Sequence, residues 1–330
     1  MSQSVLASLR SIMFLYVVAL LISISLMSGH PEVLGQSYSE TIRTDLTGIN
    51  VAVYNDSSAL DTSATALKGM FDWMGGSTAY VDRDDIRNTT VLDNYDLLVF
   101  PGGSTYGYYY ELGEEGRQKV REFVANGGSY FGICGGAMFG TNSGLGLFDG
   151  IYGSAVGGTG TYLMELNVNR SSTGPDLSDE PANYTTLYWG SSYFSGPGMA
   201  DAIPIMTYPS GGQAAMIVCR YQLGTVFLSS PHPEYEEGDP RDGTDAFDDL
   251  NDPESEWGLM LKISIWLVEI AGTELPGGTA TTTTTTTPES PSVSTSPPPP
   301  EFPLGYPLVI AALVGGLGAV AIVVVLLRRQ

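Results

Sequence analysis

An apolar segment that runs into a cysteine between glycines constrains the fold of this chain more than any other feature. It reads Phe131-Gly132-Ile133-Cys134-Gly135-Gly136-Ala137. The pattern predicts a strand, a sharp turn at Cys134 and an outgoing helix, because glycine tolerates the crowding and the unusual angles of such a turn. A thiol there would lie at a helix N-terminus, where the backbone dipole favours the reactive thiolate. The alternative interpretation is a buried cysteine in a glycine-rich bend.

Short apolar segments alternate with helix-length segments on both sides of this turn. The predicted strands are residues 49–54, 78–81, 96–100, 129–133, 162–168, 186–189, 214–220 and 224–228, the last two joined as a hairpin. Apolar positions at helical spacing predict helices at residues 61–74, 113–126 and 257–271. Strands separated by helices pair in parallel. We therefore expect one α/β domain over residues 45–273, with an open, mostly parallel sheet and helices on both faces.

A second polar motif, Ser230-Pro231-His232-Pro233-Glu234, follows the strand predicted at residues 224–228. The chain has two histidines, and the other, His30, lies beside the N-terminal apolar segment. Ligand sites in open α/β sheets lie at the carboxyl ends of the strands, so His232 is expected near Cys134. Imidazole can activate a cysteine nucleophile, and Glu234 can orient the ring. A surface His-Pro turn with a solvated acid is the alternative.

These motifs, with Pro101-Gly102-Gly103 after an earlier strand, resemble those of class I glutamine amidotransferase-like domains. They resemble in particular the N-terminal domain of biotin–protein ligases, to which Val53-Tyr54-Asn55-Asp56 and the stretch from Phe123 to Cys134 are also similar. The similarity extends over residues 49–271. It implies a flavodoxin-like sheet with Cys134 as nucleophile, His232 as base and Glu234 as the group that orients the base. It also implies oxyanion or substrate binding by Gly102, Gly103 and Gly135.

The same resemblance leaves the reaction open. The 330 residues show no ligase domain, synthetase domain or ATP-binding motif, so a simple amidase or peptidase-like hydrolase fits better than a biosynthetic amidotransferase. The expected substrate is a small-molecule or peptide amide, and we expect neither a cofactor nor a metal. A catalytically silent ligand-binding or adhesion ectodomain is the second hypothesis, with room for a protein partner. A cell-envelope structural protein is the third, and it predicts that Cys134 and His232 lie far apart.

Both ends of the chain carry features typical of membrane targeting. Residues 1–35 contain a basic start, an apolar segment and small residues, which predicts a signal peptide or an uncleaved signal anchor. Residues 274–304 are expected to form a Thr/Pro-rich stalk, and residues 305–327 predict a transmembrane helix, whose 20 uncharged residues 308–327 would span about 30 Å. The arginines in the tail at residues 328–330 favour a cytoplasmic end. We therefore expect a single-pass cell-membrane protein whose domain faces outside. Sequons that would make it a glycoprotein occur at Asn55, Asn88, Asn169 and Asn183.

The charge balance excludes one class of partner. Lys and Arg total 14 against 36 Asp and Glu, a net charge of −22, which repels nucleic-acid phosphates. Ten of the acids fall within residues 236–256, with one arginine. Such a segment can hold a hard cation such as calcium, but it lacks EF-hand spacing, so we expect a solvated acidic loop. The second cysteine, Cys219, lies in an apolar strand and is expected to be structural.

Overall fold

The computed structural model describes residues 43–88, 90–252 and 254–273. The predicted signal segment, stalk, transmembrane helix and tail lie outside these residues and stay predictions. Within the described ranges, no helix reaches the length and hydropathy of a membrane span.

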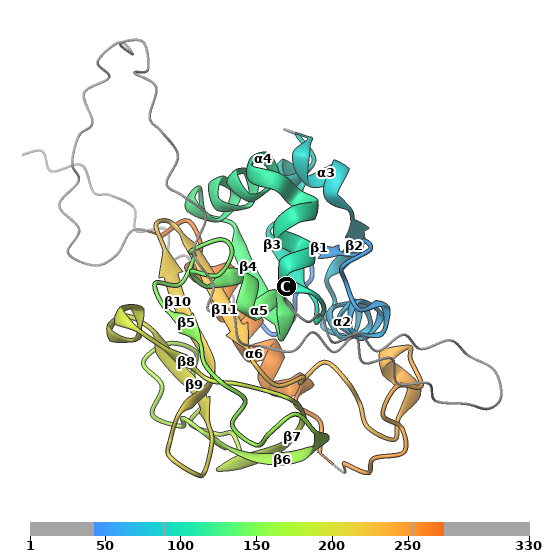
Figure 1. The fold of residues 1–330 in the computed structure, drawn as a ribbon, viewed down its shortest axis with the longest axis vertical. Coiled ribbons are helices and arrows are strands. Elements are labelled where there is room, and N and C mark those ends of the chain that lie inside the picture. The colour runs from blue at the N-terminus through green and yellow to red at the C-terminus, as the bar shows by residue number, and fades with distance from the viewer. Residues whose placement is uncertain (1–42, 89, 253, 274–330) are drawn as a thin grey trace, which may run out of the picture. The chain divides into compact units, whose positions relative to one another are not determined.

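One half of the sheet is parallel (Figure 1), in the order β2-β1-β3-β4-β11. Its strands are β1 (Asn50–Tyr54), β2 (Ser77–Val81), β3 (Leu97–Phe100), β4 (Ser129–Ile133) and β11 (Gly224–Ser229). The helices are α2 (Asp61–Trp73), α3 (Arg83–Arg87), α4 (Thr105–Ala125), α5 (Gly135–Gly140) and α6 (Trp257–Ile270). Short 3₁₀ turns occupy Leu92–Asn94, Pro197–Ala200 and Pro240–Asp242.

The other half of the sheet is antiparallel and continues the order through β10, β9, β6 and β7. Its strands are β5 (Ile151–Tyr152), β6 (Thr161–Val168), β7 (Asn183–Trp189), β8 (Phe194–Ser195), β9 (Ile203–Thr207) and β10 (Ala214–Tyr221). In Figure 1 this extension lies on the side of the domain away from α3 and α4. The predicted α/β fold is therefore confirmed. Its sheet is mixed: the pairing is parallel from β2 to β11 and antiparallel from β11 to β7.

Helices cover both faces of the parallel half, as predicted. Val51 and Val53 of β1 share a buried cluster with Leu67 of α2 and Ile263 of α6. The alternate residues Ala52 and Tyr54 pack in a second cluster with residues of α4 such as Val120. Because successive strand residues point to opposite faces, this alternation produces a three-layer domain with a core on each side of the sheet.

Several elements differ from the sequence prediction, among them helix α3 and the two-residue strands β5 and β8, which were not predicted. Helix α4 begins at Thr105 rather than residue 113 and carries a non-helical residue, Gly113, at φ 60°. Its extra turns contain Tyr108, which is buried with its hydroxyl 3.0 Å from the Pro101 carbonyl oxygen. Strand β9 was not predicted because proline interrupts it at Pro204, and proline argues against a central strand. It nevertheless pairs with β10 on one side and β6 on the other.

The acidic segment 236–256 is not the solvated loop expected from its composition. Four of its carboxylates are buried, those of Glu236, Glu237, Asp242 and Glu256. Arg241 pairs with Glu236 at 2.6 Å and lies 4.5 Å from the centre of the Trp257 ring, which fastens the segment to α6. In the part of the chain that the structure describes, no three His, Cys, Asp or Glu side chains are grouped to hold a metal ion.

Burial changes how these acids titrate. Desolvation, with the neighbouring charges of Asp252 and Glu234, raises the pKa of Glu237 to about 8 from an ordinary 4.5. Desolvation also raises the pKa of Glu256 well above its ordinary value, although the Thr186 hydroxyl donates to its Oε1 at 2.6 Å. The folded state therefore holds these protons more tightly than the unfolded chain does.

We expect Glu237→Gln to stabilise the protein at alkaline pH. Between pH 4.5 and about 8 the native state binds the Glu237 proton and the unfolded state loses it, so stability falls as pH rises through this window. At pH 8 the variant should exceed the wild type by roughly 1–3 kcal/mol in free energy of unfolding, with little difference at pH 4.5. Urea denaturation of the full-length protein measures this. Glu254→Gln, at an exposed position of the same segment, is the control and should show no such gain.

Candidate active site

The turn after β4 holds Cys134 in a backbone conformation that side chains rarely adopt. Its φ is 49° and its ψ −109°. A non-glycine residue at such angles costs about 1–3 kcal/mol and persists only where its surroundings fix it. The Cys134 N–H donates to the Ser229 carbonyl oxygen of β11 at 2.8 Å, and its own carbonyl accepts from the Met138 N–H at 2.9 Å. The side chain is partly exposed rather than enclosed in the core. The turn is therefore a nucleophile elbow, as the sequence predicted.

The glycines of the motif allow neighbouring backbones to approach the turn. A Cβ on Gly136 would lie 2.2 Å from the Phe100 carbonyl oxygen, and a Cβ on Gly135 would lie 2.1 Å from that of Gly103. No side chain fits at these distances. The glycines thus bring the end of β3 against the elbow, and this contact sets Gly103 and Gly135 side by side near Cys134.

His232 reaches the elbow from the segment that follows β11. Its backbone N–H donates to the Leu187 carbonyl oxygen at 3.0 Å, which ties this segment to β7. The ring is 1% exposed, and its Nδ1 lies 2.8 Å from Oε1 of Glu234. Its Nε2 is buried and has no hydrogen-bond partner among the described residues. Burial alone would lower the pKa of His232, but the negative charge of Glu234 and the neighbouring Cys134 raise it to about 10.

Glu234 is held by groups that the sequence analysis did not single out. Its Oε1 accepts from the Ser63 hydroxyl at 2.7 Å, and its backbone carbonyl accepts from the Trp257 indole N–H at 3.1 Å. The Ser63 oxygen in turn accepts from the Gly102 N–H at 2.9 Å. Ser63 therefore connects the carboxylate to the turn after β3. In the sequence, Ser63 is distinguished only as a small polar residue on the buried face of α2.

Five residues line a pocket of about 270 Å³ at this edge of the sheet: Leu60, Gly103, Cys134, Trp189 and His232. Three of them were predicted as site residues, and Glu234 lies directly behind His232. Of the predicted oxyanion groups, Gly103 lines the pocket and Gly135 adjoins it, whereas the Gly102 N–H already donates to Ser63. The arrangement required by the structural-protein hypothesis, with Cys134 far from His232, is not found.

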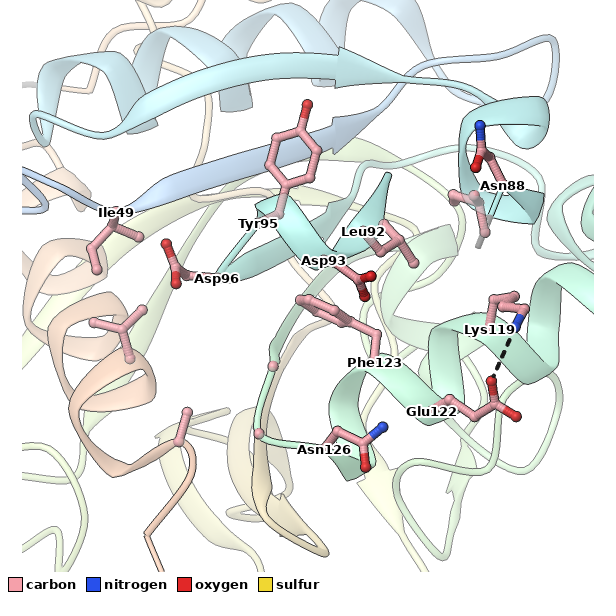
Figure 2. A pocket seen from close by; sticks show the side chains of 15 residues that line it. Ile49, Asn88, Leu92, Asp93, Tyr95, Asp96, Lys119, Glu122, Phe123 and Asn126 are labelled. Carbon is pink, nitrogen blue, oxygen red and sulfur yellow. Dashed lines mark hydrogen bonds and ion pairs between the residues drawn. The ribbon is translucent and has the colours of Figure 1, made fainter. Parts of the chain in front are cut away.

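A larger pocket of about 440 Å³ lies at the opposite edge of the sheet, where the parallel strands begin (Figure 2). Three of its charged side chains have partners: Asp96 accepts from the Asn50 N–H at 2.8 Å, and Lys119 pairs with Glu122 at 3.4 Å. Neither cysteine lines it. Reactive groups in open α/β sheets lie at the carboxyl ends of the strands, so the smaller pocket at Cys134 is the candidate active site.

Part of the domain matches a known family. Residues 49–144 match the family described as "Biotin-protein ligase, N terminal". The predicted resemblance to this family is confirmed. The match ends soon after the elbow, so that His232 and Glu234 lie beyond it.

Individual relatives cover parts of the chain. A Chlamydia muridarum (strain MoPn / Nigg) protein described as uncharacterized is 30% identical over 42% of this chain and 60% of its own length. The biotin–protein ligase of Schizosaccharomyces pombe is 26% identical over 49% of this chain and 29% of its own length. The chain thus spans less than two thirds of either relative. The structure of PurLQS from Thermotoga maritima has a TM-score of 0.48 at 17% identity, over 66% of this chain and 98% of that chain.

We expect Gly136→Ala to disrupt the elbow. The new methyl group would meet the Phe100 carbonyl oxygen at 2.2 Å, and neither backbone can move without displacing Cys134. Such overpacking should cost roughly 1–3 kcal/mol of unfolding free energy in urea denaturation. Gly258→Ala in α6 is the matched control, since a methyl group there meets nothing within 4 Å. Equal stability of the two variants would contradict the proposed role of the glycine.

Proposed function

We propose that this protein is a cysteine-dependent hydrolase of amide bonds. One observation carries the proposal: Cys134, on a strained elbow, shares a pocket with a buried His232 whose Nδ1 faces Glu234 and whose Nε2 has no partner among the described residues. A polar atom buried without a partner is costly, and such atoms concentrate where a reacting group completes the site.

The arrangement supports a two-step reaction. The Cys134 sulfur attacks the amide carbonyl carbon, forming a C–S bond, while the N–H groups of Gly103 and Gly135 stabilise the oxyanion. His232 Nε2 then protonates the leaving nitrogen, the C–N bond breaks, and an amine or ammonia departs. In the second step His232 takes a proton from water, the hydroxide attacks the thioester, and the C–S bond breaks to release a carboxylic acid. Glu234 keeps the imidazolium oriented throughout.

His232 supplies the positive charge in the proposed reaction. Because the negative charge of Glu234 and the neighbouring Cys134 raise the pKa of His232 to about 10, the ring is protonated at neutral pH. We propose that this imidazolium stabilises the Cys134 thiolate that attacks the amide. The nucleophile is then available without a separate deprotonation step. The serine-type alternative, in which a neutral histidine removes the proton during attack, needs a lower histidine pKa.

We also propose that the domain is held outside a membrane by the apolar segment of residues 305–327, on a stalk of residues 274–304. The sequence supports this proposal through an uncharged segment long enough to span a bilayer and through the arginines that follow it. Its substrates would then be extracellular amides or peptides. A silent binding ectodomain would use the same pocket without turnover.

The reactivity of Cys134 tests the hydrolase proposal. At pH 6, where an ordinary thiol is almost wholly protonated, iodoacetamide should alkylate Cys134 about tenfold or more faster than glutathione, and His232→Gln should remove the advantage. Mass spectrometry of the full-length protein measures the rate. Cys219→Ser is the control, because burial raises the pKa of Cys219 to about 12 and keeps it inert. A wild-type rate equal to that of glutathione would refute the ion pair.

Membrane insertion is tested separately. Leu317→Arg places a charge near the centre of the apolar segment, at a cost of roughly 2.5–3.5 kcal/mol, and should move the protein from the membrane to the soluble fraction after sodium carbonate extraction. Leu317→Ile is the control and should remain with the membrane. Soluble wild-type protein would rule out the anchor and leave the hydrolase proposal untouched.

A further inference from the structure

The pocket at Cys134 is lined by no acidic side chain of the described residues, although the protein as a whole carries a net charge of −22. Leu60 and Trp189 form its walls, and its polar groups are confined to the reacting end, at Gly103, Cys134 and His232. Among the described residues, no Asp, Glu, Lys or Arg side chain lines it. A ligand group with its own charges would lose water there and find no charged partner among these lining residues besides the reacting pair, Cys134 and His232, and that costs several kcal/mol. The pocket therefore suits an uncharged group.

Trp189 gives the pocket its aromatic wall. It ends β7, in the antiparallel extension and outside the matched residues 49–144. Its ring centre lies 5.6 Å from that of His232 and 5.4 Å from that of Phe247. Being 38% exposed, the indole keeps a free surface in addition to these contacts.

The acidic segment fixes this wall in place. Phe247 belongs to that segment and has a φ of 70°, which is unusual for a bulky residue. Its ring packs edge-on against Trp189 and lies 4.9 Å from the ring of Tyr235, which in turn lies 5.8 Å from His232. The indole is thus supported from behind, and an entering group meets a rigid apolar surface.

We infer that this pocket is a site for the uncharged, apolar substituent of an amide, and that Trp189 determines this specificity. The inference rests on the proposed function and narrows its substrate class. It disfavours free glutamine, whose amide is accompanied by an ammonium and a carboxylate group that find no charged partner among the described pocket residues besides the reacting pair. The pocket volume of about 270 Å³ lies just below the roughly 300–1,000 Å³ typical of ligand sites, which suits a small aromatic or branched aliphatic group.

Three electrophiles with the same reacting group test this inference on the full-length protein. They are iodoacetamide, N-benzyliodoacetamide and Nε-iodoacetyl-lysine, whose free end carries the ammonium–carboxylate pair of an amino acid. In each case the Cys134 sulfur displaces iodide, so differences in rate, corrected for the same reagents with glutathione, report recognition. We expect the benzyl compound to react roughly fivefold or more faster than iodoacetamide, and the lysine compound no faster.

Substitution of Trp189 tests whether this side chain causes the preference for the benzyl compound. Trp189→Ala should bring the benzyl-to-iodoacetamide ratio close to one, whereas Trp189→Phe, which keeps a ring, should retain most of it. Should Trp189→Ala fail to fold, Leu60→Ala opens the facing wall and should reduce the same ratio. A wild-type preference for the lysine compound, no benzyl preference, or a ratio unchanged in Trp189→Ala and Leu60→Ala would overturn the inference. Failure of the proposed function would give a different result, because iodoacetamide would then alkylate Cys134 no faster than it alkylates glutathione.

Discussion

The candidate site depends on one constraint, the strained backbone of Cys134 between strand β4 and helix α5. A residue at φ 49° and ψ −109° is maintained only by the structure around it. Here that structure is the packing of the turn after β3 against Gly135 and Gly136, together with the hydrogen bond from Cys134 to Ser229 of β11. The same contacts that impose the strain place the sulfur at the edge of the sheet, beside the segment that carries His232.

The two halves of the sheet contribute different parts of the candidate site. The parallel half provides Cys134 and the glycines near it, and it contains the residues that match the biotin–protein ligase N-terminal family. The last parallel strand, β11, leads to His232 and Glu234. The antiparallel extension provides Trp189 and anchors His232 through the Leu187 carbonyl. The cysteine turn and the aromatic wall of the pocket thus come from separate regions of the fold.

Buried charge is the second organising feature of the domain. Glu234 is fully buried, and its cost is offset by His232 and by the Ser63 hydroxyl at 2.7 Å. Close by, the acidic segment also buries carboxylates, and burial raises the pKa of Glu237 and Glu256 above their ordinary values. Buried Glu234 is thus paired with an imidazole, whereas Glu237 and Glu256 favour the protonated form.

The sequence by itself determined the local structure and the residues of the candidate site that come from its two motifs, Cys134, His232 and Glu234. Hydrophobic periodicity predicted the bounds of most strands and helices to within a few residues, because each element buries one face. The glycines on both sides of Cys134 predicted its turn, because the turn needs them. Tertiary structure alone decided what reaches that turn. Ser63, Leu60, Trp189 and Phe247 come from segments far apart in the chain, and none has a local pattern that distinguishes it from ordinary core or surface residues. The acidic segment shows the same limit, since its composition predicts solvation and only packing against α2 and α6 buries it.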